Sequence, residues 1–436
     1  MDAPFDRREF LKTTAGTLAL LLSRQGLRAA QTPQRQTPAG PPVRFGLVGL
    51  GVWGREILDA LGRIDSAQIA AICDLYEPFL KRAAGNVPNG APTTDWRRLA
   101  DAPDIDAIVV ATPTPVHREI VLAALQAGKH VYCEAPIAAS RDDARAIATA
   151  ANNAARVVFQ AGLQGRANPL YAHVRQFVKS GVLGDVALVN AQWGRKDSWR
   201  RAAPSAERER ALNWRLEKSS AGLMGEIAIH QLDLVSHYLG VRPSTIVGNG
   251  TIAAWKDGRE TPDTASCLID FGNTRATVRA TLASSFGGAY TIFQGSNSSL
   301  LLKENRGWLI KEADSPLLGW EVYARKESVH DETGIALVAD ATKLLQAGKE
   351  PGQDAPLEPE KPALVVAFEA FIASIRTGAA PVCGPADAYA ATVAALEANA
   401  AVVANSKIEL RQEDYAAEYA AEHTATCAEH AEAIDV

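Results

Sequence analysis

The residues with the clearest chemistry in this sequence are three glycines, Gly49, Gly51 and Gly54, spaced as G-x-G-x-x-G. An apolar run at residues 43–48 precedes them and a helical pattern at 55–61 follows. In that setting Gly49 allows a tight turn, Gly51 lets the backbone approach a pyrophosphate, and Gly54 lets the helix pack closely on the strand. The helix N-terminus then offers unpaired N–H groups to the phosphates. The pattern predicts a dinucleotide site, and the alternative is a glycine-rich turn without a ligand.

A carboxylate stands where such a site needs one. Asp74 lies 20 residues beyond Gly54 and directly after an apolar run at residues 69–73. At the tip of a second strand, this carboxylate would accept both ribose hydroxyls of an unphosphorylated nicotinamide dinucleotide and would repel a 2′-phosphate. The sequence therefore favours NAD over NADP, with Val52 and Trp53 in the same predicted site.

A second set of residues, Glu226, His230 and Asp233, has the types and spacing for proton transfer. If this segment is a helix, the i, i+4 spacing of Glu226 and His230 puts both side chains on one face, with Asp233 three residues further on. A histidine flanked by carboxylates can act as a general acid or base. The alternative for such a string is a pair of charged residues on a helix surface.

Aromatic and basic residues come shortly before this cluster, at residues 195–200 and 213–215. Indole faces stack on the C–H surface of sugar rings, while arginine and asparagine side chains hydrogen-bond hydroxyls or anionic groups. The alternative is a solvated charged loop. The candidate substrate-binding residues are Trp199, Arg200, Asn213, Trp214 and Arg215.

The elements that must position these residues alternate between strand-like and helical runs from residue 43 to residue 163. Strands separated by helices indicate a parallel sheet with helices on both faces. The predicted strands are 43–48, 69–73, 107–111, 130–133 and 157–160, and the predicted helices are 55–61, 78–84, 117–127 and 141–155.

The pattern changes over residues 164–412, where strand-like runs follow one another without intervening helices. This arrangement suggests an antiparallel or mixed sheet. Residues 413–436, rich in Ala, Glu and His, are expected to form a solvated tail or helix. The predicted strands are 186–193, 244–254, 264–271, 275–284, 290–295 and 299–302, and the predicted helices are 169–179, 363–377 and 386–404.

Residues 1–30 differ in kind from the rest of the chain. Residues 7–12 (RREFLK) lead into a mildly apolar stretch at 13–22, which resembles a twin-arginine export signal. That stretch is about half as long as a bilayer-spanning helix, so we expect no permanent membrane anchor. Residues 31–42 have the Pro-rich composition of a linker. The sequence thus predicts export by the twin-arginine machinery to the periplasm, where an enzyme without a soluble NAD pool must hold its cofactor tightly.

Composition excludes several other classes of function. The net charge of −5 provides no basic field for nucleic acid or an anionic membrane surface. The cysteines are odd in number, and none has CxxC or zinc-ligand spacing. We expect neither a disulfide framework nor a metal site from Cys73, Cys133, Cys267, Cys383 and Cys427.

Several motifs in one order resemble the Gfo/Idh/MocA family of nicotinamide-dependent, mostly sugar-handling enzymes. After the glycine pattern and Asp74 come residues 111–117 (ATPTPVH), 128–136 (GKHVYCEAP) and 226–233 (EIAIHQLD). The resemblance covers residues 43 to the early 400s. It implies an α/β protein with an N-terminal Rossmann domain, a doubly wound parallel sheet, at 43–163. A C-terminal α/β domain with an open, mainly antiparallel sheet would follow at 164–412, and the chain would form a homo-oligomer.

The same resemblance implies positions for the cofactor. Thr112 and Pro113 would end a strand beside the dinucleotide, His117 would start the following helix, and Glu134 would lie near the nicotinamide-side ribose. A helix-capping role is an equal alternative for His117.

In the family register His230 is catalytic, with Glu226 in place of the usual first aspartate and with Glu226 and Asp233 orienting the imidazole. The chain departs from the family at Ala135, because the usual Glu-Lys-Pro reads Glu-Ala-Pro. Alanine cannot donate a hydrogen bond or carry the charge that the family's lysine brings to the substrate. Lys196 is the nearest candidate to replace that lysine.

Three functions are compatible with these residues. The first is an exported NAD-dependent oxidoreductase that transfers hydride at a secondary hydroxyl of a sugar or polyol, with a tightly bound cofactor. The second is a redox-neutral glycoside hydrolase that works by oxidation, elimination, addition of water and reduction. The third is a sugar-binding protein without catalytic activity.

Overall fold

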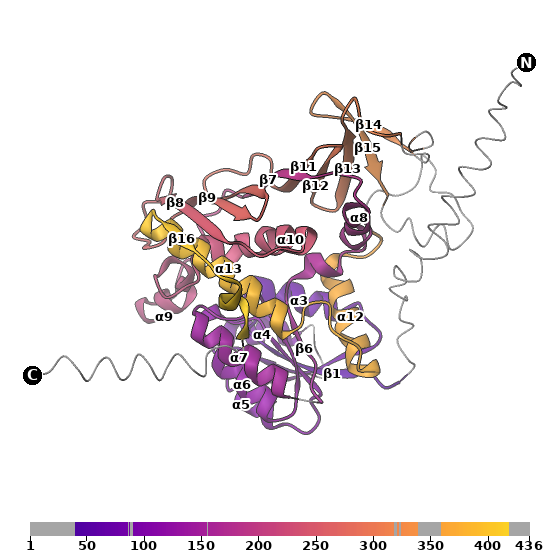
Figure 1. The fold of residues 1–436 in the computed structure, drawn as a ribbon. Helices are drawn as coiled ribbons and strands as arrows, with labels where there is room; N and C mark the ends of the chain where they lie inside the picture. Colours follow the sequence, from indigo (N-terminus) through magenta and orange to yellow (C-terminus); the bar gives the residue numbers. More distant parts are fainter. Residues whose placement is uncertain are drawn as a thin grey trace, which may run out of the picture.

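The computed structural model of the 436-residue chain describes residues 40–85, 87, 90–154, 156–317, 321, 324–338 and 359–417. These residues form two sheets, with helices packed on and between them (Figure 1). The predicted export signal, all but the last residues of the predicted linker and most of the predicted tail lie outside the described residues.

The first sheet has six parallel strands in the order β3-β2-β1-β4-β5-β6. Its central strands are continuous apolar runs because helices cover both faces. This confirms the doubly wound Rossmann sheet, to which the structure adds β3 and α5. The strands are β1 (Val43–Val48), β2 (Ala67–Cys73), β3 (Ala91–Thr93), β4 (Ala107–Val110), β5 (His130–Cys133) and β6 (Phe159–Ala161), and the helices are α3 (Val52–Gly62), α4 (Glu77–Ala84), α5 (Arg97–Asp101), α6 (His117–Gln126) and α7 (Arg141–Asn153).

The second sheet has ten strands in the order β14-β15-β13-β12-β11-β7-β10-β9-β8-β16. Only β7 and β10 pair in parallel, which confirms a mainly antiparallel sheet. The strands are β7 (Val186–Gly194), β8 (Thr245–Thr251), β9 (Thr264–Phe271), β10 (Thr274–Thr281), β11 (Ala289–Gly295), β12 (Ser298–Lys303), β13 (Arg306–Lys311), β14 (Lys326–Val329), β15 (Glu332–Leu337) and β16 (Lys407–Glu409).

Helices lie between the two sheets and cover one face of the second (Figure 1). Along β8, β9 and β7 the opposite face leaves Val247, Leu268 and Leu188 exposed. The helices of this half are α8 (Pro169–Lys179), α9 (Ala206–Leu212), α10 (Ile229–Leu239), α12 (Ala363–Thr377) and α13 (Pro385–Ala404), and a π-turn (Met224–Ala228) directly precedes α10.

The late helix α12 packs on the Rossmann sheet and completes its core. The ring of Phe368 lies 4.4 Å from that of Tyr132 and 6.3 Å from that of Phe45. Phe371 packs on the same two rings, and all four aromatic residues are fully buried. Residues more than 200 positions apart in the sequence therefore form one apolar core around β1 and β5.

Helix α13 and the segment after it tie the two halves together. Arg141 at the start of α7 pairs with Glu397 at 3.1 Å and with Asp414 at 2.9 Å. Tyr415 is buried, and its hydroxyl donates to the carbonyl oxygen of Pro243 at 2.9 Å. The start of the segment expected to be solvated is thus packed as far as residue 417, because Tyr415 anchors it.

The cysteines of the described ranges are all reduced and buried, at Cys73, Cys133, Cys267 and Cys383. Within these ranges no cluster of histidine, cysteine or carboxylate side chains could hold a metal ion. A search of the same residues finds no helix with the length and apolar character needed to cross a bilayer.

Candidate functional site

The glycine turn between β1 and α3 has the shape that a pyrophosphate needs. Gly49 has a φ of +99°, and a Cβ there would lie 2.5 Å from the carbonyl oxygen of Ala111. A Cβ on Gly54 would lie 2.0 Å from the carbonyl oxygen of Gly49, so only glycine lets α3 approach the strand. A Cβ on Gly51 would meet none of the described atoms within 4 Å. This open space, with Val52 and Trp53 exposed beside it, leaves the helix N-terminus accessible to phosphates.

The carboxylate of Asp74 lies beside this turn, at the end of β2. It accepts hydrogen bonds from the backbone N–H groups of Leu50 and Tyr76, both at 2.7 Å. Burial raises the pKa of the Asp74 carboxyl, and these two N–H groups and the positive charge of Arg208 oppose that shift. Asp74 therefore occupies the place of a ribose-binding acid.

Two buried polar atoms at the ends of β4 and β5 have no hydrogen-bond partner among the described residues: Oγ1 of Thr112 and Oε1 of Glu134. Orphaned polar atoms of this kind fit a polar ligand that completes the site. The other oxygen of Glu134 accepts from Gln164 at 3.3 Å. Burial raises the pKa of Glu134 to about 8, and the polar side chains of Trp53 and Gln164 oppose the shift. Thr112 and Glu134 thus form a polar edge at the carboxyl ends of β4 and β5, and this edge suits the ribose hydroxyls of NAD.

His117 joins the ends of the same two strands. Its Nε2 lies 3.0 Å from the carbonyl oxygen of Thr112 and its Nδ1 lies 3.1 Å from that of Pro136. Burial lowers the pKa of His117 to about 4, so the ring is neutral at pH 7 and donates only one of these hydrogen bonds at a time. His117 is the first residue of α6, and its ring holds the backbone carbonyl groups of Thr112 and Pro136 in place.

Glu226 lies in the π-turn, at the junction between the two halves of the molecule. Its carboxylate accepts from the Thr114 hydroxyl at 3.1 Å and from the N–H of Ala221 at 3.2 Å, and it lies 3.6 Å from Nε of Arg215. Burial raises the pKa of Glu226, and the charge of Arg215 opposes this. The segment expected to be one α-helix therefore changes type between the two residues: Glu226 lies in a turn with i→i+5 hydrogen bonds, and His230 lies on α10.

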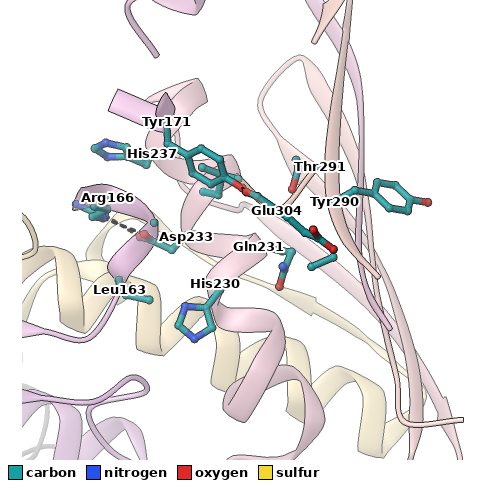
Figure 2. Close-up of a pocket in the computed structure, with 13 residues that line it drawn as sticks. Leu163, Arg166, Tyr171, His230, Gln231, Asp233, His237, Tyr290, Thr291 and Glu304 are labelled. Carbon is teal, nitrogen blue, oxygen red and sulfur yellow. Dashed lines mark hydrogen bonds and ion pairs between the residues drawn. The ribbon is translucent and has the colours of Figure 1, made fainter. Parts of the chain in front are cut away.

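His230 and Asp233 lie on α10, and no hydrogen bond or ion pair joins their side chains. Asp233 instead forms a bidentate pair with Arg166, at 2.9 and 2.7 Å, and both side chains are buried (Figure 2). Neither Asp233 nor Glu226 hydrogen-bonds His230, whose ring nitrogens have no such partner in the part of the chain that the structure describes. The expected orienting role of the two carboxylates is thus not observed. Burial lowers the pKa of His230, and the charge of Asp233 opposes the shift.

A pocket of about 140 Å³ lies against His230. Its lining includes Leu163, Gly165 and Arg166, which flank Gln164 in the segment after β6. Gln231, Tyr290 and Glu304 form its other side, and in Figure 2 the imidazole of His230 points away from Tyr290. The pocket thus offers hydrogen-bonding groups of the kind that bind hydroxyls.

Arg215 is the positively charged residue that lies beside Glu226, at the junction between the two halves of the molecule. Its guanidinium lies 4.5 Å from the ring centre of Trp214 and 5.7 Å from that of Trp199, and its Nε faces Glu226. Its charge also lowers the pKa of His117 at the ends of β4 and β5. Three of the five candidate substrate-binding residues therefore form one group beside the predicted cofactor edge.

The other candidates are placed differently. Both amide donors of Asn213 are used within the loop, on the carbonyl oxygens of Arg201 and Glu209. Arg200 pairs with Glu209 at 2.7 Å, so these two residues stabilise the loop. Lys196 is exposed after β7, and the recorded hydrogen bond of this residue is made by its backbone to Ser285.

Sequence reasoning missed Thr114, Gln164 and Arg166. Each follows the carboxyl end of a parallel strand, which is where open α/β sheets bind their ligands. That rule, applied to β4 and β6 as well as to β1 and β2, would have selected all three.

Comparisons with known proteins agree with this geometry. The model of the oxidoreductase family with an NAD-binding Rossmann fold matches residues 43–162, and the Gfo/Idh/MocA C-terminal domain model matches residues 171–301. An uncharacterized oxidoreductase of Streptococcus pneumoniae is 28% identical over 324 residues, which is 72% of this chain and 83% of that protein.

A levoglucosan dehydrogenase of Pseudarthrobacter phenanthrenivorans is 30% identical over 165 residues, covering 37% of this chain and 40% of that enzyme. The structure of a levoglucosan dehydrogenase in complex with NADH matches 85% of this chain and 100% of that one, with a TM-score of 0.68 and 20% identity. Together with the glycine turn and Asp74, these matches establish that the chain belongs to the Gfo/Idh/MocA oxidoreductase family and is an enzyme that uses NAD.

Proposed function

We propose that this enzyme transfers hydride at a secondary hydroxyl of a sugar or polyol. The observation that carries the proposal is the unpartnered imidazole of His230, which borders a pocket whose lining also includes Gln231 and Glu304. The levoglucosan dehydrogenase relative acts on a sugar by its name, which supports this class of substrate.

The residues of this chain can manage the proton and the charge of such a reaction. NAD, when bound, supplies a carbon that accepts the hydride. His230 is neutral at pH 7 because burial lowers its pKa, so it can take the proton of the substrate hydroxyl as the C–H bond breaks. The product is a ketone, and the reverse reaction returns the proton from His230.

Arg215 is better placed than Lys196 to stabilise the oxygen that loses this proton. The guanidinium lies against Trp199, Trp214 and Glu226, whereas Lys196 is exposed. A fixed positive charge at a developing alkoxide lowers the barrier without transferring a proton itself. Arg215 thus supplies the positive charge that the family's lysine would bring to the substrate oxygen, and that Ala135 cannot supply.

One observation favours redox-neutral glycoside cleavage as a second candidate. Burial raises the pKa of Glu226, so the junction holds a second proton-transfer group close to Arg215. Elimination next to a transient ketone needs such a group in addition to His230.

The test begins with the purified enzyme. Denaturation should release about one NAD per chain after dialysis, and levoglucosan, aldohexoses and cyclic polyols are then screened for NADH absorbance. NADH formation with a free sugar supports the first function. Aglycone release from nitrophenyl glycosides without net NADH supports the second, and sugar binding without either product identifies a binding protein.

We also propose that residues 1–30 direct export by the twin-arginine machinery to the periplasm. The arginine pair and the short apolar stretch support this. Replacing both Arg7 and Arg8 by lysine should leave the protein in the cytoplasmic fraction, and unchanged fractionation would contradict export by this route.

We further propose that the enzyme is a homo-oligomer that pairs through the uncovered face of the second sheet. Leu268 and Val247 lie opposite each other on that face and are 60% and 42% exposed. Leu268→Glu should lower the molar mass measured by light scattering, and an unchanged mass would exclude this surface.

A further inference from the structure

The short helix α9 reaches from the C-terminal half of the chain to the adenosine end of the cofactor site. The guanidinium of Arg208 lies over the ring of Tyr76, 4.7 Å from its centre. Tyr76 follows Asp74 by two residues and donates its backbone N–H to that carboxylate. Arg208 is therefore next to the acid that takes the ribose hydroxyls, although more than 130 residues separate them in the sequence.

Arg208 has hydrogen-bonding capacity left for a ligand. Its Nε is buried and has no hydrogen-bond partner within the described ranges. Its charge acts on Asp74 and opposes the burial that raises the pKa of this carboxyl. A planar cation seated on an aromatic ring, with an unused donor, can also pack on a base or donate to a ribose oxygen.

The loop that carries α9 is fixed to its own half of the molecule. Glu209, the next residue, pairs with Arg200 at 2.7 Å, and its carbonyl oxygen accepts from Asn213 at 3.0 Å. Arg200 also lies 3.5 Å from Asp257. These contacts fix the segment that presents Arg208 to Tyr76 at the edge of the Rossmann sheet.

We propose that α9 closes the adenosine end of the cofactor site, with Arg208 packing against the adenosine of bound NAD and slowing its release. The proposal rests on the NAD site and not on the substrate or the reaction. Arg208 would thereby help to retain the cofactor, in addition to the binding provided by the glycine turn and Asp74.

The test measures NAD exchange on the intact enzyme. The protein is loaded with NADH, mixed with excess NAD, and followed by the loss of NADH fluorescence. Arg208→Ala should release NADH about 10-fold faster, and Arg208→Lys should give an intermediate rate, since a cation–π contact is lost or weakened. Arg210→Ala is the matched control, because Arg210 lies on the same helix and pairs with Glu217.

Two further measurements keep the proposal falsifiable. Nicotinamide mononucleotide lacks the adenosine, so its affinity should be the same in wild type and Arg208→Ala, while that of ADP-ribose should fall in the variant. Equal release rates for Arg208→Ala and Arg210→Ala would overturn the proposal, as would equal losses for both nucleotides. If Arg208→Ala does not fold, Arg208→Met, which keeps the length of the side chain, takes its place.

Discussion

The two ends of the predicted cofactor site are built in different ways. The adenosine end uses residues 49–76, where a glycine turn and one carboxylate follow two neighbouring strands. At the other end Glu134 accepts from Gln164, Glu226 faces Arg215, and His230 borders a pocket, and these residues come from distant parts of the chain. A sequence pattern describes the first end well because its contacts are local, whereas long-range packing decides which side chains meet at the second.

The two ends also differ in how far their residues follow the family pattern. The adenosine end keeps the glycines and the acid, so its binding chemistry follows from residue type. At the other end Ala135 stands where the family resemblance implies a lysine, and the loop that follows β7 brings Arg215 to Glu226. Variants of each end should therefore separate cofactor binding from chemistry.

The largest effect is expected from His230→Ala. Loss of the proton acceptor should slow hydride transfer about 1,000-fold, or about 4 kcal/mol of barrier. The affinity for NAD should stay within about twofold, because no cofactor-edge residue contacts His230 by a hydrogen bond. Single-turnover NADH formation with the sugar identified by screening measures the first quantity and fluorescence titration the second. Full activity in the variant would exclude His230 as the base.

Arg215→Ala should slow hydride transfer about 100-fold, or about 2.7 kcal/mol, because an alkoxide loses a fixed positive charge. Lys196→Ala is the matched control and should change the rate less than twofold. Adding Ala135→Lys to Arg215→Ala should restore part of the rate. If Lys196→Ala has the larger effect, the roles of the two cations are reversed.

Glu134→Gln tests the cofactor edge through pH. The folded protein holds a proton on Glu134 up to about pH 8, whereas the unfolded carboxyl releases it near its usual value of 4.5. Rising pH therefore favours the unfolded state, and between pH 5.5 and 7.5 this group should lower the free energy of unfolding of the NAD-free protein by about 2 kcal/mol. Glutamine has no such proton, so urea unfolding of the variant should depend less on pH. Parallel pH curves for both proteins would disprove the assignment.

Asp74→Ala should have the smallest effect of the four, about a 10-fold loss of NAD affinity or about 1.4 kcal/mol. The preference for NAD over NADP should narrow, because a carboxylate no longer repels the 2′-phosphate. Asp74→Asn keeps an acceptor for the N–H groups of Leu50 and Tyr76 and should retain more of the affinity for NAD. Titrations with both dinucleotides measure the change, and an unaltered preference would place the ribose elsewhere.

Much of the fold could be predicted from residue patterns. The bounds of β1, β5, β9, α8 and α12 agree with the expected ranges, because the strands are continuous or alternating apolar runs and the helices bury apolar residues at helical spacing. Strands β13 to β15 were missed because they are short and rich in Lys, Glu and Gly, and the sheet edge holds them by pairing.

The substrate end was harder to predict for a physical reason. The string of Glu226, His230 and Asp233 suggests one cluster, but Glu226 lies in a π-turn, where it accepts from Thr114 and faces Arg215. Arg166 then takes Asp233 into a buried pair, a contact between segments 67 residues apart. The spacing of residues in a sequence predicts neither the type of helical turn nor which distant side chain, here Arg166, will pair with Asp233.

The packing of α12 on the Rossmann sheet affects how the chain must fold as it is made. Phe368 and Phe371 cover Phe45 and Tyr132, but they are synthesised about 200 residues after the last strand of that sheet. At roughly 5–20 residues per second, the apolar side of the sheet stays uncovered for about 10–40 s on the ribosome. The domain that binds NAD thus reaches its finished core only after residues 368 and 371 have been made.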